Sequence, residues 1–418
     1  MKKIVMGLAA VAMATSMFAA DPAFAPSLAE YSGNQSVTWG IDLDKDNKTG
    51  FKNDGSATLK FNLFTAGDKT TSGDSDVWAE LKIVNGSNDT TSSMQLPSGD
   101  AAVKVDVAKF HFGPIYVGIK TGDTQVGGCK PQTAIKSGNV GIEAVGPAGY
   151  DQGIVAGYSD DNFGLDIDFR SKPVKVGDKT NYYTNDYALA AEAAFKASNE
   201  FVTGLEVKAG MAYQFDDDAE VAYAASAAYK VDLGDYYLKP TVGYTSANEM
   251  VGAVLFGWGD EADADAGVYY LKDGYKKVTP GVSVLYKKDL DNDNDLGAYS
   301  FAFNLGSKVE NLKAAALAEM GMAKVADETI TTLNVKAGCA YDIKAEDITI
   351  TTKAGCDWTK ATKVMGAEVG AALKVSAGVD VAGVINNTTL SAEYVSGDLL
   401  ADPDAEKGKV NFTAKIAL

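Results

Sequence analysis

The chain has 418 residues, with 43 Gly, 10 Pro and a formal net charge of -18 from 38 basic and 56 acidic side chains. This acidic balance argues against nucleic-acid binding, which needs a basic face. The length allows two or three ordinary domains or one large all-β unit.

The N-terminus resembles a targeting segment. Residues 1–20 begin with MKK and continue with an apolar stretch that ends in small residues, which is typical of a secretory signal peptide. We expect cleavage after Ala20, which leaves 21–418 as the mature chain. A cut as late as residue 25 also fits the small residues there, but it would leave Pro26 first. Beyond this segment no apolar run approaches the roughly 18 to 20 residues of a membrane helix.

Apolar and polar residues alternate with a period of two through much of the mature chain, as in a strand with two different faces. Each stretch is about ten residues long, which is enough to cross a bilayer at a tilt. Clusters rich in Gly, Asp and Asn separate the stretches, as in turns. In chain order the clearest stretches are 36–43, 163–170, 204–215, 220–231, 363–375 and 410–418. One further stretch, 103–112, loses its phase after Val107 and regains it at Phe110, which suggests a β-bulge.

These strands predict an all-β fold, a large antiparallel transmembrane β-barrel of roughly 16 to 20 strands. A soluble β-sandwich or β-helix is the alternative, with the apolar phase facing a packed core. The strands are long for a sandwich, their polar phase carries many charges, and aromatic residues lie near strand ends. The segment 120–151 has no firm alternation, so it is a domain boundary, a surface loop or an inward-folded constriction loop. We favour one continuous barrel.

Charged residues of both signs occupy the polar phase of the strands, where a water-filled lumen would be. Mixed signs predict weak ion selectivity. The candidate pore-lining residues are Asp166, Asp168, Arg170, Glu206, Lys208, Glu368 and Lys374.

Two segments near the mature N-terminus resemble the treponemal major outer sheath protein family, which includes the Tpr proteins. They are SVTWGIDLDKDNKTGFKNDGSATLKFNL at 36–63 and VWAELKI at 77–83, in this order after a signal peptide. The resemblance implies a spirochaetal outer-membrane β-barrel with surface-exposed loops, porin activity, adhesion to host matrix proteins such as fibronectin and laminin, and assembly into homo-oligomers. Residues 26–120 would then correspond to the family's N-terminal region and 152–418 to its C-terminal region.

Little in the sequence points to catalysis. A single histidine, His111, cannot build a multi-histidine metal site, and the common hydrolase and metalloprotease motifs do not occur. The Asp- and Asn-rich stretch 289–297 departs from the EF-hand pattern, so a solvated turn explains it better than a calcium site. We therefore expect neither an enzyme nor a cofactor.

Two cysteines, Cys339 and Cys356, lie in the similar stretches KAGCAYD and KAGCDWT. Export permits a disulfide between them. A turn near 344–347 would place them on adjacent strands, about one diagonal step apart, so unpaired thiols fit as well.

The function predicted from these observations is an outer-membrane, porin-like channel for small hydrophilic solutes, in contact with outer-membrane lipid and also acting as an adhesin. One alternative is an adhesin for which the barrel serves only as a scaffold. Another is a soluble periplasmic β-protein.

Overall fold

The structure is a computed structural model of the chain. It describes residues 29–43, 48–64, 77–86, 103–120, 124–135, 141–150, 152–172, 174–176, 179–181, 186–197, 202–215, 220–258, 280–292, 295–325, 328–361, 370–401 and 407–417. The expected signal peptide, 1–20, and Glu368 lie outside these ranges.

Antiparallel strands make up most of the described chain. In chain order they are β1 (Ala29–Asp42), β2 (Thr49–Phe64), β3 (Val77–Gly86), β4 (Val103–Phe112), β5 (Ile115–Lys120), β6 (Gln152–Ser159), β7 (Phe163–Ser171), β8 (Val174–Val176), β9 (Lys179–Asn181), β10 (Tyr187–Lys196), β11 (Leu205–Gln214), β12 (Ala222–Tyr229), β13 (Val231–Asp232), β14 (Tyr236–Thr245), β15 (Glu249–Trp258), β16 (Gly281–Asp289), β17 (Asp295–Val309), β18 (Leu312–Val325), β19 (Glu328–Ala345), β20 (Ile348–Ala361), β21 (Ala371–Ala382), β22 (Thr388–Val395) and β23 (Lys409–Ala417). Within the same ranges, no helix is long and apolar enough to span a bilayer.

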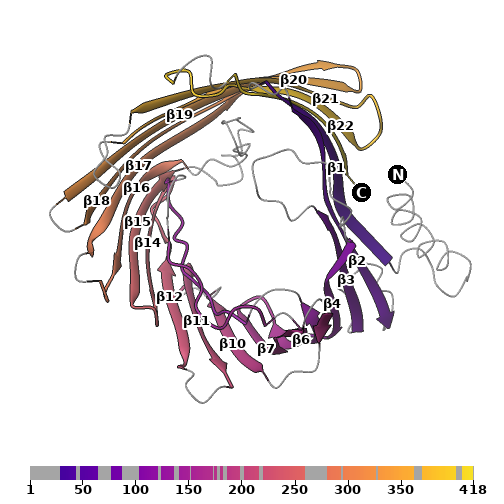
Figure 1. The fold of residues 1–418 in the computed structure, drawn as a ribbon, viewed down its shortest axis with the longest axis vertical. Coiled ribbons are helices and arrows are strands. Elements are labelled where there is room, and N and C mark those ends of the chain that lie inside the picture. Colours follow the sequence, from indigo (N-terminus) through magenta and orange to yellow (C-terminus); the bar gives the residue numbers. More distant parts are fainter. Residues whose placement is uncertain are drawn as a thin grey trace, which may run out of the picture.

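One sheet closes on itself to form a barrel (Figure 1). β1 pairs with β2 on one side and with β23 on the other, so the two ends of the chain complete the ring. β12 and β13 both pair with β14, and they therefore count as one interrupted strand. Within the described residues, the 21 segments of this sheet thus form a closed barrel of 20 strands, at the upper limit of the prediction. β8 and β9 form a separate hairpin.

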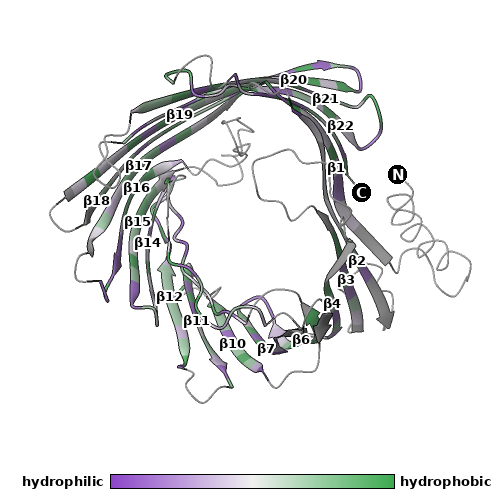
Figure 2. Ribbon diagram, in the orientation of Figure 1, coloured by the Kyte–Doolittle hydropathy of each residue, from purple (hydrophilic) through white to green (hydrophobic). Residues whose placement is uncertain are grey.

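Side chains are sorted by face, as the period of two predicts. On β11 the outward residue Met211 is 54% exposed, whereas its inward neighbour Ala212 is 1% exposed. On β17 the outward Phe303 is 42% exposed and the inward Asn304 is fully buried. Figure 2 shows the corresponding alternation of hydrophilic and hydrophobic residues along the strands. A closed single sheet leaves these large outward side chains without a second sheet to cover them, which contradicts a β-sandwich and fits a lipid-facing surface.

Local irregularities fix the register of neighbouring strands. The pairing of β3 with β4 shifts between Lys82 and Ile83, whose partners are Val107 and Val105, so a bulge is present but lies at residue 106, before the predicted position after Val107. β19 and β20 are joined by a two-residue turn at Glu346, whose φ is 52°. A residue with positive φ is what such a tight hairpin requires.

Candidate functional site

The segment between β5 and β6 folds into the barrel. Its described parts, 124–135 and 141–150, lie inside the ring along the wall from β10 to β16 (Figure 1). The two parts are joined by an isolated antiparallel bridge, in which Val126 and Val145 exchange backbone hydrogen bonds of 2.8 and 3.0 Å. β5 and β6 pair directly with each other, so the chain leaves and re-enters the same sheet. This arrangement favours a constriction loop over a surface loop or a domain boundary. We call 124–135 together with 141–150 the inner segment.

Apolar side chains hold the inner segment against the wall. Cys129 and Ile142 are buried together with Leu255 of β15 and Leu285 of β16. Val126 is buried against inward alanines of β10, β11 and β12. The alternation in the sequence predicts an inner face that is polar throughout. The structure differs, because part of the inner face packs against protein instead of facing water. The sequence carries a signal for this, since β15 (EMVGAVLFGW) is apolar in both phases, as in a strand covered on both faces.

Polar contacts fix the same segment. The backbone N–H of Gly127 donates to Glu192 Oε2 on β10 at 2.6 Å, and Glu192 Oε1 pairs with Lys208 Nζ on β11 at 2.6 Å. The N–H of Ala134 donates to the Ser283 hydroxyl on β16 at 3.0 Å, and both groups are buried. Of these residues only Lys208 is among the candidate pore-lining residues. Glu192 lies in the inward phase of β10, but nothing local in the sequence identifies its partner at residue 127.

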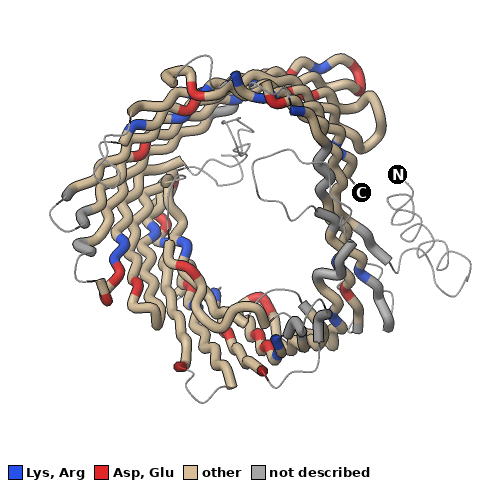
Figure 3. The backbone as a smooth tube through the Cα atoms, viewed as in Figure 1, with Lys and Arg blue, Asp and Glu red and all other residues tan. Residues whose placement is uncertain are grey.

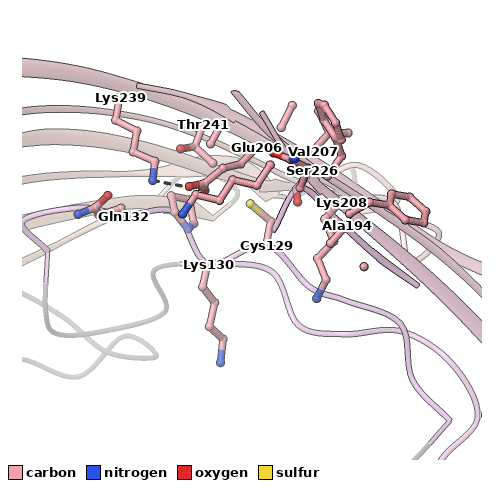
Figure 4. A pocket seen from close by; sticks show the side chains of 18 of the residues that line it. Cys129, Lys130, Gln132, Ala194, Glu206, Val207, Lys208, Ser226, Lys239 and Thr241 are labelled. Carbon is pink, nitrogen blue, oxygen red and sulfur yellow. Dashed lines mark hydrogen bonds and ion pairs between the residues drawn. The ribbon is translucent and has the colours of Figure 1, made fainter. Parts of the chain in front are cut away.

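A cavity of about 550 Å³ lies between the inner segment and the wall (Figure 4). Glu206 and Lys239 line it and form an ion pair of 3.4 Å. Cys129 points toward the wall, whereas Lys130 points away from it and is exposed. Burial raises the pKa of the Cys129 thiol. The cavity thus places ammonium, carboxylate and hydroxyl groups side by side and carries no strong excess of either charge.

Three other predicted residues lie together on β7, two strands away from β11. Asp166 accepts a hydrogen bond from the Tyr116 hydroxyl of β5. Arg170 is 2% exposed and its Nη2 lies 2.9 Å from Asp168 Oδ1. Lys374 is exposed on β21, apart from both groups. The structure therefore brings Glu206 and Lys208 to the inner segment, gathers Asp166, Asp168 and Arg170 on β7, and separates Lys374 from both groups.

A ladder of ion pairs crosses the inward face of β18 to β21. The pairs are Lys313–Asp342 at 2.9 Å, Lys336–Asp357 at 3.3 Å and Lys353–Asp380 at 2.7 Å. Each joins two adjacent strands, and Figure 3 shows both signs of charge distributed around the ring. Opposite charges at inward positions of neighbouring strands neutralise this part of the wall.

The candidate disulfide is not formed. Cys339 lies opposite Ala354, and Cys356 lies opposite Ala337, so the two thiols are diagonal neighbours on adjacent strands. Both are free, as is Cys129. The offset follows from the register that the turn at Glu346 imposes.

Comparison with known proteins agrees with this architecture. No family model matches the chain. The major surface protein MspTL of Treponema lecithinolyticum is 28% identical, with 94% of this chain and 93% of that protein aligned. The major outer membrane protein MspA of Treponema maltophilum is 27% identical over the full length of both.

Among solved structures, OccK11 of Pseudomonas aeruginosa matches 93% of this chain and 96% of its own, with 9% identity and a TM-score of 0.46. OmpF of Salmonella typhi matches 93% of this chain and 97% of its own, with 10% identity and a TM-score of 0.32. These scores are too low to add to what the strand pairing establishes. The two full-length relatives, in contrast, confirm the resemblance found at 36–63 and 77–83: the chain is an outer-membrane β-barrel protein related to the treponemal major outer sheath proteins.

Proposed function

We propose that the protein is a porin-like channel for small hydrophilic solutes. The observation that carries this proposal is a closed 20-strand barrel with large apolar side chains outside and charged side chains inside. Barrels of 16 to 18 strands already leave an aqueous channel. The residues proposed to line the pore are Asp166, Asp168, Arg170, Glu206, Lys208, Lys374 and, from the sequence alone, Glu368.

Water would fill the lumen because the inward charges stay solvated there, and solutes would cross by diffusion. The cross-strand ion pairs and the mixed charges of the cavity favour passage without a strong preference for anions or cations. Both relatives are named for the cell surface or the outer membrane, and neither name describes an enzyme. This supports a role in transport across the membrane rather than in catalysis.

The test is reconstitution in a planar lipid bilayer. Protein extracted in detergent is first shown to be folded by heat-modifiable migration in gel electrophoresis. We expect discrete conductance steps in KCl solution, because a water-filled lumen conducts small ions. Folded protein that inserts and yet gives no conductance steps would overturn the proposal.

Adhesion to fibronectin or laminin and assembly into homo-oligomers remain predictions from the resemblance. The acidic loop 260–266, which we would delete to test adhesion, lies outside the described residues. Loss of matrix binding with unchanged conductance would assign adhesion to this loop. Unchanged binding would rule the loop out as the adhesive surface.

A further inference from the structure

We propose that Glu192 locks the inner segment onto the barrel wall, and that the locked segment sets the size limit for solutes. This inference rests on the proposed channel function and extends it to a positioning residue and a fixed constriction. Three observations carry it: how Glu192 is bound, how closely the wall fits the segment, and how far along the wall the anchors extend.

Each carboxylate oxygen of Glu192 has its own partner. Oε2 accepts the Gly127 N–H and Oε1 pairs with Lys208, both at 2.6 Å. Hydrogen bonds to ionised groups are shorter and stronger than neutral ones. The lysine on β11 holds the Glu192 side chain in place, and the second oxygen is thereby directed at the backbone of the inner segment. Glu192 thus connects the wall to the segment, whereas the Glu206–Lys239 pair connects two wall strands.

The wall beneath the segment consists of residues small enough to admit it. A Cβ atom at Gly210 would lie 2.8 Å from Val126 Cβ, closer than real side chains approach. A Cβ atom at Gly243 of β14 would collide with the Cys129 side chain. The segment consequently lies almost directly on the backbone of β11 and β14. Any side chain at these two positions would push it away from the wall.

The anchors cover a wide arc of the barrel. Glu192 lies on β10, and Ser283, which accepts the Ala134 N–H, lies on β16. Between them, Cys129 and Ile142 bury apolar surface against Leu255 and Leu285. The segment therefore occupies part of the lumen along the whole of this arc. It thereby narrows the lumen of the 20-strand barrel, so the segment determines which solutes pass.

The experiment compares single-channel conductance and solute exclusion in three variants. Glu192→Ala removes the polar anchor, and Gly243→Ala displaces the segment sterically without changing any charge. Gly252→Ala is the matched control, because a Cβ atom there meets nothing within 4 Å. We expect the first two variants to raise the mean conductance by roughly a factor of two, because permeation depends on pore diameter. They should also admit larger sugars in liposome swelling, while Gly252→Ala should match the wild type.

A crosslink provides a second, independent test. Cys129 and Ser226 of β12 line the same cavity (Figure 4), so Ser226→Cys brings a second thiol to Cys129. In the Glu192→Ala background, oxidation of this pair should restore the wild-type conductance, and a reductant should reverse the effect.

The outcomes separate the two proposals. Folded Glu192→Ala and Gly243→Ala variants that conduct like the wild type, with the same sugar cut-off, would overturn the fixed constriction and leave the channel proposal intact. A folded wild type without any conductance would overturn the channel proposal itself.

Discussion

A single carboxylate, Asp398, fixes the loop that follows β22. Its Oδ1 accepts the backbone N–H groups of Leu373 at 2.9 Å and Leu400 at 3.0 Å. These hydrogen bonds, that from Leu373 first, lower the pKa of Asp398 below its ordinary value. The stabilisation is therefore present above the unfolded pKa of about 3.9 and is lost as the pH falls through the lower folded value. We expect Asp398→Ala to lower the unfolding temperature by a few degrees at neutral pH. In acid, the unfolding temperatures of the variant and the wild type should become equal.

The measurement is the temperature at which the compact electrophoretic form is lost, recorded from neutral pH down to acid. Asp235→Ala, at an exposed carboxylate in the turn before β14, serves as the control. The difference in unfolding temperature between this variant and the wild type should not depend on pH. A constant difference between Asp398→Ala and wild type at every pH would mean that the loss comes from packing and not from the carboxylate charge.

At the scale of elements, the seam between β1 and β23 is the strand pairing that we expect substitutions to weaken most. Most neighbouring strands are joined by a local connection, whereas these two lie at opposite ends of the chain and meet only when the barrel closes. Trp39 and Phe412 stack across the seam with ring centroids 5.6 Å apart, and the hydroxyls of Thr38 and Thr413 lie 2.8 Å apart. Phe412→Ala should destabilise the folded barrel by about 1 kcal/mol, the typical contribution of an aromatic pair.

Thermal conversion of the folded form measures this effect. Phe301→Ala on β17 is the comparison, because Phe301 also faces outward but its strand is held by local hairpins. An equal or larger loss in the Phe301 variant would show that the seam has no special importance for closure.

The elements differ in how far the sequence determines them. β7, β11 and β23 were predictable, because lipid on one side and water on the other impose a period of two on local sequence. The inner segment has no periodicity, and its position depends on contacts such as Gly127 with Glu192 that join residues far apart in the chain. Inward leucines on β15 and β16 make sense only once that segment covers them. Ion-pair partners such as Lys353 and Asp380 likewise required the register between strands.

On the scale of the whole molecule, the distribution of charge determines how ions enter. The chain has a net charge of -18, yet the inward face of β18 to β21 carries basic and acidic residues in pairs. Much of the negative excess therefore belongs to segments between strands, such as the acidic run at 260–265. We expect a weak preference for cations at low salt that fades at high salt. Screening shortens the range of exposed charges from about 10 Å at 0.1 M to about 3 Å at 1 M ionic strength.

Reversal potentials in KCl gradients, centred on low and then on high concentration, measure this preference. We expect deletion of the acidic run 260–266 to weaken the cation preference at low salt and to change little at high salt, because exposed charges act on entering ions only where salt does not screen them. Asp380→Asn changes a charge inside the lumen instead. It removes the carboxylate that pairs with the Lys353 ammonium, so it should shift selectivity toward anions at both salt concentrations. A strong selectivity that is the same at both salt concentrations in the wild type would locate the controlling charge inside the barrel and contradict a neutralised wall.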